Sequence, residues 1–177
     1  MKKERREKIM DLVRKAGDPD NYEVSHDERG IPQVKEKAKI KMGGKSRAKG
    51  SQFELKVRRD LEEQGRVVDK WNNNVDLETD KLIIAKRKFN PFSKVMTIGT
   101  GFPDFISIKH IHDGVYSVIG VEVKTNGTLS KIEKQKCAWC LKNKIFSQIW
   151  IAKIGGERGQ IIYEDFSEKY GDKYDKA

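Results

Sequence analysis

The chain has 177 residues, enough for one domain of ordinary size with an extension and for a sizeable buried core. Charged and hydrophobic residues each make up 36% of it, which is polar for a globular domain but excludes a fully disordered composition. The net charge of +10 and the pI of about 9.5 favour a polyanionic partner, most often nucleic acid, over a generically soluble basic protein.

We expect a cytoplasmic protein without a membrane segment. No apolar run approaches the roughly 20 residues that a membrane-spanning helix needs. The sequence begins Met-Lys-Lys-Glu-Arg-Arg and no apolar core follows, so a signal peptide is not predicted. Two cysteines without an export signal fit a reducing compartment.

The N-terminal part predicts a charged helix and a basic arm. The pattern predicts a helix over 2–16, which a Gly-Asp-Pro sequence ends, and a linker or loosely ordered segment over 17–34. Residues 35–49 hold seven basic residues against one acidic residue, and Gly43-Gly44 keeps them flexible. They form either a solvated, disordered arm or a phosphate-binding arm that orders on its target, and we favour the second. The basic residues are Lys35, Lys37, Lys39, Lys41, Lys45, Arg47 and Lys49.

The first amphipathic helix is predicted from Ser51 to Gln64. Ser51 is a good N-cap, and Glu54 three residues later completes a capping box. Apolar residues recur at i, i+4 and i+8, and Gly65 ends the helix. Glu54 therefore has a structural role available at the cap.

A strand over Arg66–Trp71 and an inserted β-hairpin are predicted next. Lys81–Phe89 reads as one strand, and Ser93–Ile98 pairs back on it across the turn at Asn90-Pro91. Basic residues alternate there with phenylalanines, which is typical of a DNA-contacting ribbon and equally of an ordinary exposed hairpin. These residues are Lys81, Lys86, Arg87, Lys88, Phe89, Phe92 and Lys94.

The stretch from Gly101 to Thr125 predicts two strands joined by a polar turn. β-Branched and aromatic residues fill both halves, and Gly, Pro and Asp bound them. Asp104 opens the first strand, while Glu122 and Lys124 sit two apart near the end of the second, so their side chains point to one face. Charged groups on an otherwise apolar strand are unfavourable unless they are paired or bound to a metal. Two carboxylates and a lysine on neighbouring strands make a compact site for a hard cation and an attacking water.

The C-terminal part predicts a helix, Leu129–Asn143, and strands over Gln148–Ile154 and Gln160–Tyr163. Ser130 is the N-cap of this helix, and Glu133 is the capping-box partner. Cys137-Ala138-Trp139-Cys140 could be half of a zinc site with His110 and His112, or a redox pair. Because the cysteines fall inside a helix and no second CxxC exists, we favour buried thiols.

Several of these motifs resemble the PD-(D/E)xK nuclease superfamily. The core pattern appears as Pro103-Asp104, a spacer long enough for a strand, a turn and a return, and then Glu122-Val123-Lys124. Lys49-Gly50-x-x-x-Glu54 resembles the opening of archaeal Holliday-junction resolvases within the superfamily, where the helix glutamate helps hold the metal. Leu129-Ser130-x-x-x-x-Gln135 resembles the VRR-NUC and phage-type branches, where a glutamine or a nearby polar side chain lines the site, although a lone helix glutamine is usually solvated. The inserted hairpin departs from the compact resolvases and leaves the substrate class open.

The resemblance covers residues 49–154 and implies an α/β fold: a restriction-endonuclease-like αβββαβ core with a mixed central sheet, here carrying the inserted β-hairpin. We therefore expect a nuclease domain over 49–177, while the charged helix and basic arm of 1–48 lie outside the resemblance. It implies a metal-dependent DNA endonuclease, structure-specific in the manner of Holliday-junction resolvases. The alternatives are a flap or restriction-like nuclease of the same fold, or a catalytically inactive DNA-binding module. Mg²⁺ or Mn²⁺ would be held by the ligand set, and Lys124 would orient the attacking water. The implied ligands are Asp104, Glu122, the Val123 carbonyl and Glu54.

A homodimer is expected as well, because resolvase-like relatives nick two symmetric strands of a four-way junction. The aromatic residues support this expectation, since they exceed what a small core must hold and some are expected at an interface. They are Trp139, Phe146, Trp150 and Tyr163.

Overall fold

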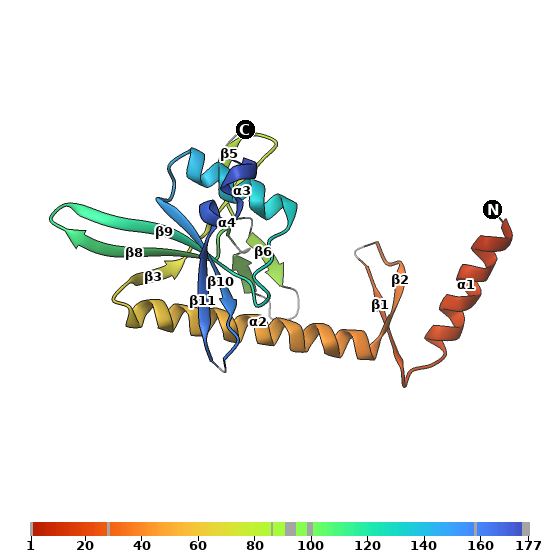
Figure 1. Cartoon of the computed structure of the whole chain (residues 1–177). Helices are drawn as coiled ribbons and strands as arrows, with labels where there is room; N and C mark the ends of the chain where they lie inside the picture. The colour runs from red at the N-terminus through yellow and green to blue at the C-terminus, as the bar shows by residue number, and fades with distance from the viewer. Residues whose placement is uncertain are drawn as a thin grey trace. The chain divides into compact units, whose positions relative to one another are not determined.

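The computed structural model describes residues 2–27, 29–85, 87–90, 95–98, 101–157 and 159–174. The chain divides into two compact units, Met1–Ser51 and Gln52–Ala177. The fold is mixed α/β, with four helices in the described ranges and a five-stranded mixed sheet (Figure 1). None of the helices in these ranges is both long and apolar enough to cross a membrane.

The first unit contains a β-hairpin where a linker was expected. Helix α1 (Lys2–Ala16) is followed by strands β1 (Tyr22–His26) and β2 (Pro32–Glu36), which pair antiparallel. The turn between them is built by Asp27, whose Oδ1 accepts the backbone N–H groups of Arg29 and Ile31, both at 2.9 Å. Gly30 supplies the left-handed residue with φ of +75°. The prediction of a loosely ordered segment is wrong because this turn chemistry was overlooked.

Helix α2 (Lys37–Glu63) is continuous through the predicted basic arm. Ser51 therefore lies inside the helix, and the predictions of a helix start at Ser51, a capping box with Glu54 and a disordered arm are wrong. Lys, Ala and Arg dominate the segment before Ser51, and their high helix propensity carries the helix across Gly43 and Gly44. The Lys37 N–H donates to the Asn21 carbonyl at 2.8 Å, which ties the start of the helix to the hairpin.

The second unit is built on the sheet, in the order β11-β10-β9-β8-β3. Strands β9 and β10 are parallel, and all other neighbours are antiparallel. The predicted strand pair of Gly101–Thr125 is confirmed as β8 and β9. The strands are β3 (Val67–Lys70), β8 (Phe105–His112), β9 (Val115–Val123), β10 (Gln148–Ile154) and β11 (Ile161–Asp165).

Both faces of the sheet are covered by helices (Figure 1). The C-terminal half of α2 packs Phe53, Val57 and Leu61 against one face, where the strands contribute Val68, Phe105, Ile119, Val121 and Ala152. Helices α3 (Lys131–Lys142) and α4 (Phe166–Tyr174) cover the other face. That second cluster contains Phe102, Leu129, Cys137, Cys140, Phe146, Ile149, Ile151 and Phe166.

The inserted region forms two small strand pairs outside the main sheet. Strand β4 (Asn73–Asp76) pairs with β5 (Lys81–Ile84), and β6 (Arg87–Asn90) pairs with β7 (Val95–Ile98). The predicted pairing is confirmed for Val95–Ile98, whereas the predicted single strand Lys81–Phe89 forms two strands with different partners, β5 against β4 and β6 against β7. The buried Ala85 follows β5, and its N–H donates to the Asn72 carbonyl at 2.9 Å. Most of the predicted DNA contacts here fall outside the described side chains, namely Lys86, Arg87, Lys88, Phe89, Phe92 and Lys94.

The aromatic residues that suggested a dimer pack within their own chain. Phe146 is buried against Trp71 in an edge-to-face contact, with ring centroids 5.2 Å apart. Trp150 contacts Tyr163 in a tilted arrangement, with ring centroids 5.6 Å apart, and Trp139 packs against the cluster under α3. These side chains therefore give no support to the expected homodimer.

Candidate active site

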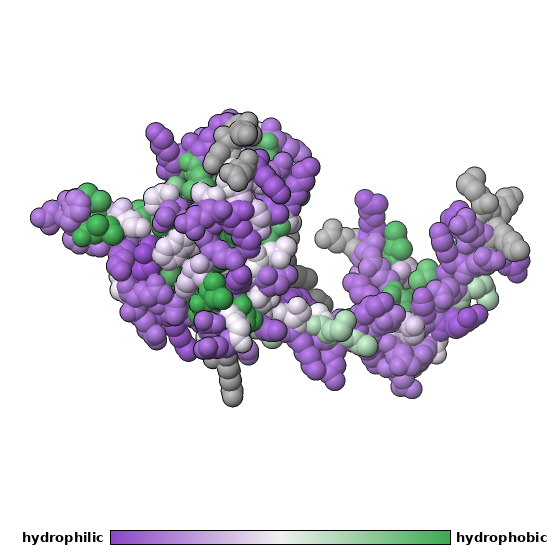
Figure 2. All heavy atoms as spheres, in the orientation of Figure 1, coloured by the Kyte–Doolittle hydropathy of each residue, from purple (hydrophilic) through white to green (hydrophobic). Residues whose placement is uncertain are grey.

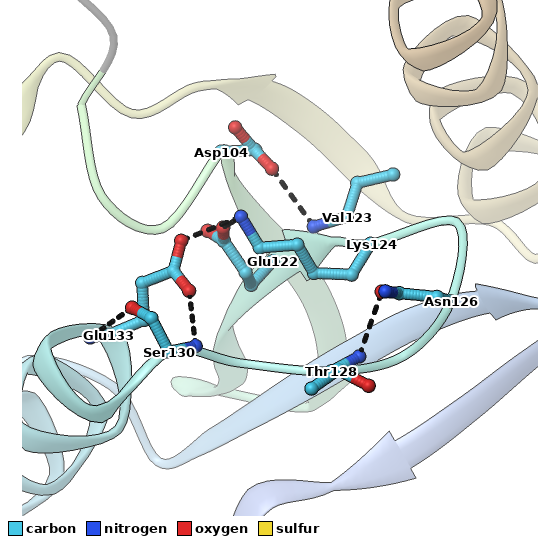
Figure 3. Close-up of polar contacts among 8 residues, drawn as sticks. All are labelled: Asp104, Glu122, Val123, Lys124, Asn126, Thr128, Ser130 and Glu133. Atoms are coloured by element: carbon cyan, nitrogen blue, oxygen red, sulfur yellow. Dashed lines mark hydrogen bonds and ion pairs between the residues drawn. The ribbon is translucent and has the colours of Figure 1, made fainter. Parts of the chain in front are cut away.

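Two carboxylates meet where β8 begins and β9 ends. Phe105 pairs with Val121 in the antiparallel register, which places Asp104, the residue before β8, across from Glu122. The Val123 N–H donates to Oδ2 of Asp104 at 2.9 Å (Figure 3). The sequence alternation and the hairpin connection are thus sufficient to bring together the two acids that were singled out as candidate ligands.

Glu122 is the most unusual residue of this site. Its side chain is only 4% exposed, and its Oε2 atom is buried without a hydrogen-bond partner. Burial, and then the negative charge of Asp104, raise the pKa of Glu122 to about 8 against the opposing effect of Lys124. Burial likewise raises the pKa of Asp104, with a contribution from the charge of Glu54 and against the effect of the Val123 N–H. The site therefore holds two acids that both resist ionisation.

Lys124 lies between two carboxylates rather than beside one. Its Nζ is 3.0 Å from Oε1 of Glu122 and 2.6 Å from Oε1 of Glu133 (Figure 3). Burial acts to lower the Lys124 pKa, but the hydrogen bonds and charges of the two glutamates outweigh it and raise that pKa above its ordinary value. Lys124 is a fixed cation, and because it stands closer to Glu133 its charge compensates Glu122 only in part.

Glu133 is the site residue that the sequence analysis recognised only as a cap. The predicted capping box is confirmed: Ser130 Oγ accepts the Glu133 N–H at 3.3 Å, and Oε2 of Glu133 accepts the Ser130 N–H at 2.7 Å. The turn after β9 is tight, since the Gly127 N–H donates to the Lys124 carbonyl at 2.8 Å. It returns the start of α3 to the end of β9, so that the free oxygen of the capping glutamate reaches Lys124. Only the tertiary path of this turn gives Glu133 its second contact.

Glu54 lies near the carboxylates but binds another residue. Its Oε2 is 2.6 Å from Nζ of Lys70, which also lies over the Phe105 ring at 5.1 Å. After burial, the negative charge of Glu54 also contributes to the raised pKa of Asp104. The structure thus places Glu54 at the edge of the site.

Gln135 points elsewhere. It is exposed on α3 and lines a cavity of about 680 Å³ together with Trp139, Phe166 and Tyr174, outside the polar contacts of Asp104 and Glu122. The residues that the structure brings together are therefore Asp104, Glu122, Val123 and Lys124, to which it adds Glu133.

The two cysteines are free and buried in the core between α3 and the sheet. Burial raises the pKa of Cys140 to about 12 and that of Cys137 further. His110 and His112 lie toward the other end of β8, where His110 contacts the Tyr116 ring. The preference for buried thiols over a zinc or redox pair agrees with this arrangement.

The carboxylate pair has the donor chemistry that a hard divalent cation requires. Oxygen ligands suit Mg²⁺ or Mn²⁺, and the unpartnered Oε2 of Glu122 is a buried acceptor that a cation would satisfy. Within the described part of the chain, no three His, Cys, Asp or Glu side chains are grouped closely enough to bind a metal by themselves. A cation here would therefore have two carboxylate side chains, with water or substrate oxygens completing its shell.

The seven predicted phosphate-binding residues all lie in the first unit. Lys35 is on β2 and the other six are on the first half of α2, and all are exposed. Lys39 forms an exposed ion pair with Glu36 at 3.0 Å.

Comparison of the chain with protein-family models, with curated proteins and with solved structures finds no match to any of them.

Proposed function

We propose that the unit Gln52–Ala177 is a metal-dependent deoxyribonuclease of the PD-(D/E)xK kind. The observation that carries the proposal is the meeting of Asp104, Glu122 and Lys124 at the ends of two paired strands, with Glu122 buried and one of its oxygens unpartnered. Burying two acids together destabilises a fold, so a purely structural role gives no reason for the arrangement. A bound cation relieves this repulsion, and catalytic sites are where such perturbed groups gather.

The fold is compatible with this proposal. Helix α2, strands β3, β8 and β9, helix α3 and strand β10 follow one another in the order αβββαβ once the small strand pairs β4–β7 are set aside. This order is the one expected of a restriction-endonuclease-like core. The carboxylates stand at the end of its central hairpin.

The residues would divide the chemistry as follows. Asp104 and Glu122 would hold Mg²⁺ or Mn²⁺, with the Val123 carbonyl and Glu54 close by. When bound, the cation neutralises charge on the scissile phosphate and makes the attacking water more acidic. Lys124 would orient that water and stabilise the charge that builds on the phosphate oxygens. Glu133 would keep Lys124 in place and charged.

DNA is the proposed substrate because the chain carries a net charge of +10 and a polyanion is its natural partner. Branched DNA and a homodimer complete the proposal, as the two-fold symmetry of a four-way junction suggests. A DNA-binding module without hydrolysis is the competing proposal. It is favoured by one observation: Lys124 and both carboxylates already have partners within the chain.

The decisive experiment measures cleavage of end-labelled duplex, flap, splayed-arm, four-way-junction and single-stranded DNA with Mg²⁺, Mn²⁺ or EDTA. We expect Asp104→Asn, Glu122→Gln and Lys124→Ala each to lower the rate at least about a hundredfold while DNA binding is retained. Asp113→Asn, at the exposed turn of the same hairpin, is the matched control and keeps the wild-type rate. Cleavage in EDTA would exclude a metal-dependent mechanism. DNA binding without cleavage under every condition would favour the catalytically inactive DNA-binding module.

A further inference from the structure

The first unit has almost nothing of its own to hold it folded. Among the side chains described in Met1–Ser51, none is buried, and eight large apolar residues are exposed. Figure 2 shows them as separate patches on a mostly hydrophilic surface. An isolated two-stranded hairpin is marginal in water. Lys41, Lys45 and Lys49 repel one another at i+4 spacing along α2, and glycines interrupt the same segment. The exposed apolar residues are Ile9, Met10, Leu12, Val13, Val24, Ile31, Ile40 and Met42.

The hairpin and the first half of α2 enclose a groove of about 800 Å³ within this unit. Three basic side chains line it: Lys35 from β2, and Lys39 and Arg47 from α2. Nε of Arg47 donates to the Gly43 carbonyl at 3.4 Å, which holds the guanidinium along the helix. Ser25, Ser46, Ile40, Gly43 and one acid, Glu23, complete the lining.

Six of the seven basic residues between positions 35 and 49 fall into two sets, those that line the groove and those that lie on the far face of α2. Lys39 and Arg47 lie two helical turns apart on the face of α2 that lines the groove, with Gly43 between them. Lys41, Lys45 and Lys49 lie roughly 150° around the helix from this face and are absent from the groove lining. Gly43 leaves open space where a side chain would stand. A ligand can therefore approach the helix backbone closely between the two basic residues.

We propose that this groove binds the phosphodiester backbone of a nucleic-acid strand and that the contact stabilises the unit Met1–Ser51. Arginine and lysine carry a charge opposite to that of phosphate oxygens, and serine hydroxyls donate hydrogen bonds to phosphate oxygens. The unit has 15 basic against 9 acidic residues, a net charge of +6 out of +10 for the chain, so a polyanion is the complementary partner. A ligand that binds only the folded form shifts the folding equilibrium toward it. The inference extends the proposed function, since it names a second place where the same substrate is held.

The test compares two triple variants that remove the same charge. One is Lys35→Gln, Lys39→Gln and Arg47→Gln in the groove, and the other is Lys41→Gln, Lys45→Gln and Lys49→Gln on the far face. Both are made in the full chain with Glu122→Gln, and binding of labelled duplex and single-stranded DNA is measured in EDTA across a salt series. Hydrolysis plays no part in this binding measurement. The groove proposal can therefore be confirmed when the nuclease proposal fails, and the nuclease proposal can be confirmed when the groove proposal fails.

We expect the groove triple to lower the slope of log K against log salt by about 2 to 3 and the affinity about a hundredfold at 0.1 M salt. The far-face triple is expected to lose less than about tenfold, through long-range attraction alone. Hydrogen exchange should show residues 37–50 gaining protection on DNA in the far-face triple and not in the groove triple. Equal losses of affinity in the two triple variants would overturn the groove as the binding site. Polyglutamate of the same total charge that displaced the DNA would also overturn it, because the contact would then respond to charge and not to phosphates. Strong protection without ligand would overturn the coupling to folding.

Discussion

Replacing Glu122 by glutamine should stabilise the metal-free protein at alkaline pH. The carboxyl has a folded-state pKa of about 8 against an ordinary value of 4.5, because burial and Asp104 oppose its ionisation. Between these two pH values the folded state binds more protons than the unfolded state, so the free energy of unfolding falls as pH rises through that window. Below pH 4.5 the carboxyl is protonated in both states and contributes nothing.

The magnitude follows from the same two values. Each pH unit between them is equivalent to about 1.4 kcal/mol, which gives an upper limit of about 5 kcal/mol of destabilisation at pH 8 and above. Glutamine removes the ionisation and with it the charge in the contact with Lys124, but its amide oxygen can still accept a hydrogen bond, and Lys124 keeps its ion pair with Glu133 at 2.6 Å. We therefore expect Glu122→Gln to exceed the wild type by at least about 2 kcal/mol at pH 8.5 and to match it at pH 5. The lowered pKa of Glu133 has the opposite effect on stability: its charged form stabilises the folded state, and this stabilisation is lost only as the pH falls below about 4.5.

Urea unfolding in EDTA at pH 5, 6, 7 and 8.5, followed by tryptophan fluorescence, measures this difference. Asp113→Asn removes an exposed carboxylate and should follow the wild type at every pH. Adding Mg²⁺ at pH 8.5 should stabilise the wild type more than Glu122→Gln, because only the wild type has both carboxylates that would bind the cation. Parallel pH profiles for wild type and Glu122→Gln, or a variant less stable at pH 8.5, would refute the reasoning.

Three further outcomes are expected. Glu133→Gln preserves the helix cap, so it should change the free energy of unfolding by less than about 0.5 kcal/mol. It should nevertheless slow DNA cleavage at saturating protein tenfold or more, because it releases Lys124. An unchanged cleavage rate would mean that Glu133 serves only as a helix cap. Gly43→Gln fills the groove and should weaken DNA binding at least threefold, whereas its neighbour variant Gly44→Gln should not, and equal affinities would contradict the groove. The two buried cysteines, with raised pKa values, should react with a disulfide reagent at pH 8 only in unfolded protein, and rapid reaction of native protein would contradict their burial.

The sequence was sufficient where local chemistry and tertiary packing agree. The strands over Gly101–Thr125 could be predicted because β-branched residues and turn formers specify both the strands and the hairpin. Strand alternation then placed Glu122 and Lys124 on one side, with Asp104 across from them. The cap of α3 could be predicted as well, since Ser130 and Glu133 satisfy each other within one turn.

The sequence misled where two local signals compete. Ser51 and Glu54 make a plausible helix start, but the high helix propensity of the preceding residues extends α2 back to Lys37. The segment before it was expected to be loosely ordered because single polar turn residues are weak signals, although Asp27 fixes a hairpin there.

Other features exist only in the folded chain. The burial of Glu122, and with it the raised pKa, arises because α3 and the neighbouring strands exclude water from a carboxyl that looks ordinary in the sequence. The second contact of Glu133 depends on the tight turn that returns α3 to Lys124. The sequence determined that basic residues cluster between positions 35 and 49, but helix periodicity and the facing hairpin decided which of them line the groove, because that selection depends on direction as well as on position along the chain.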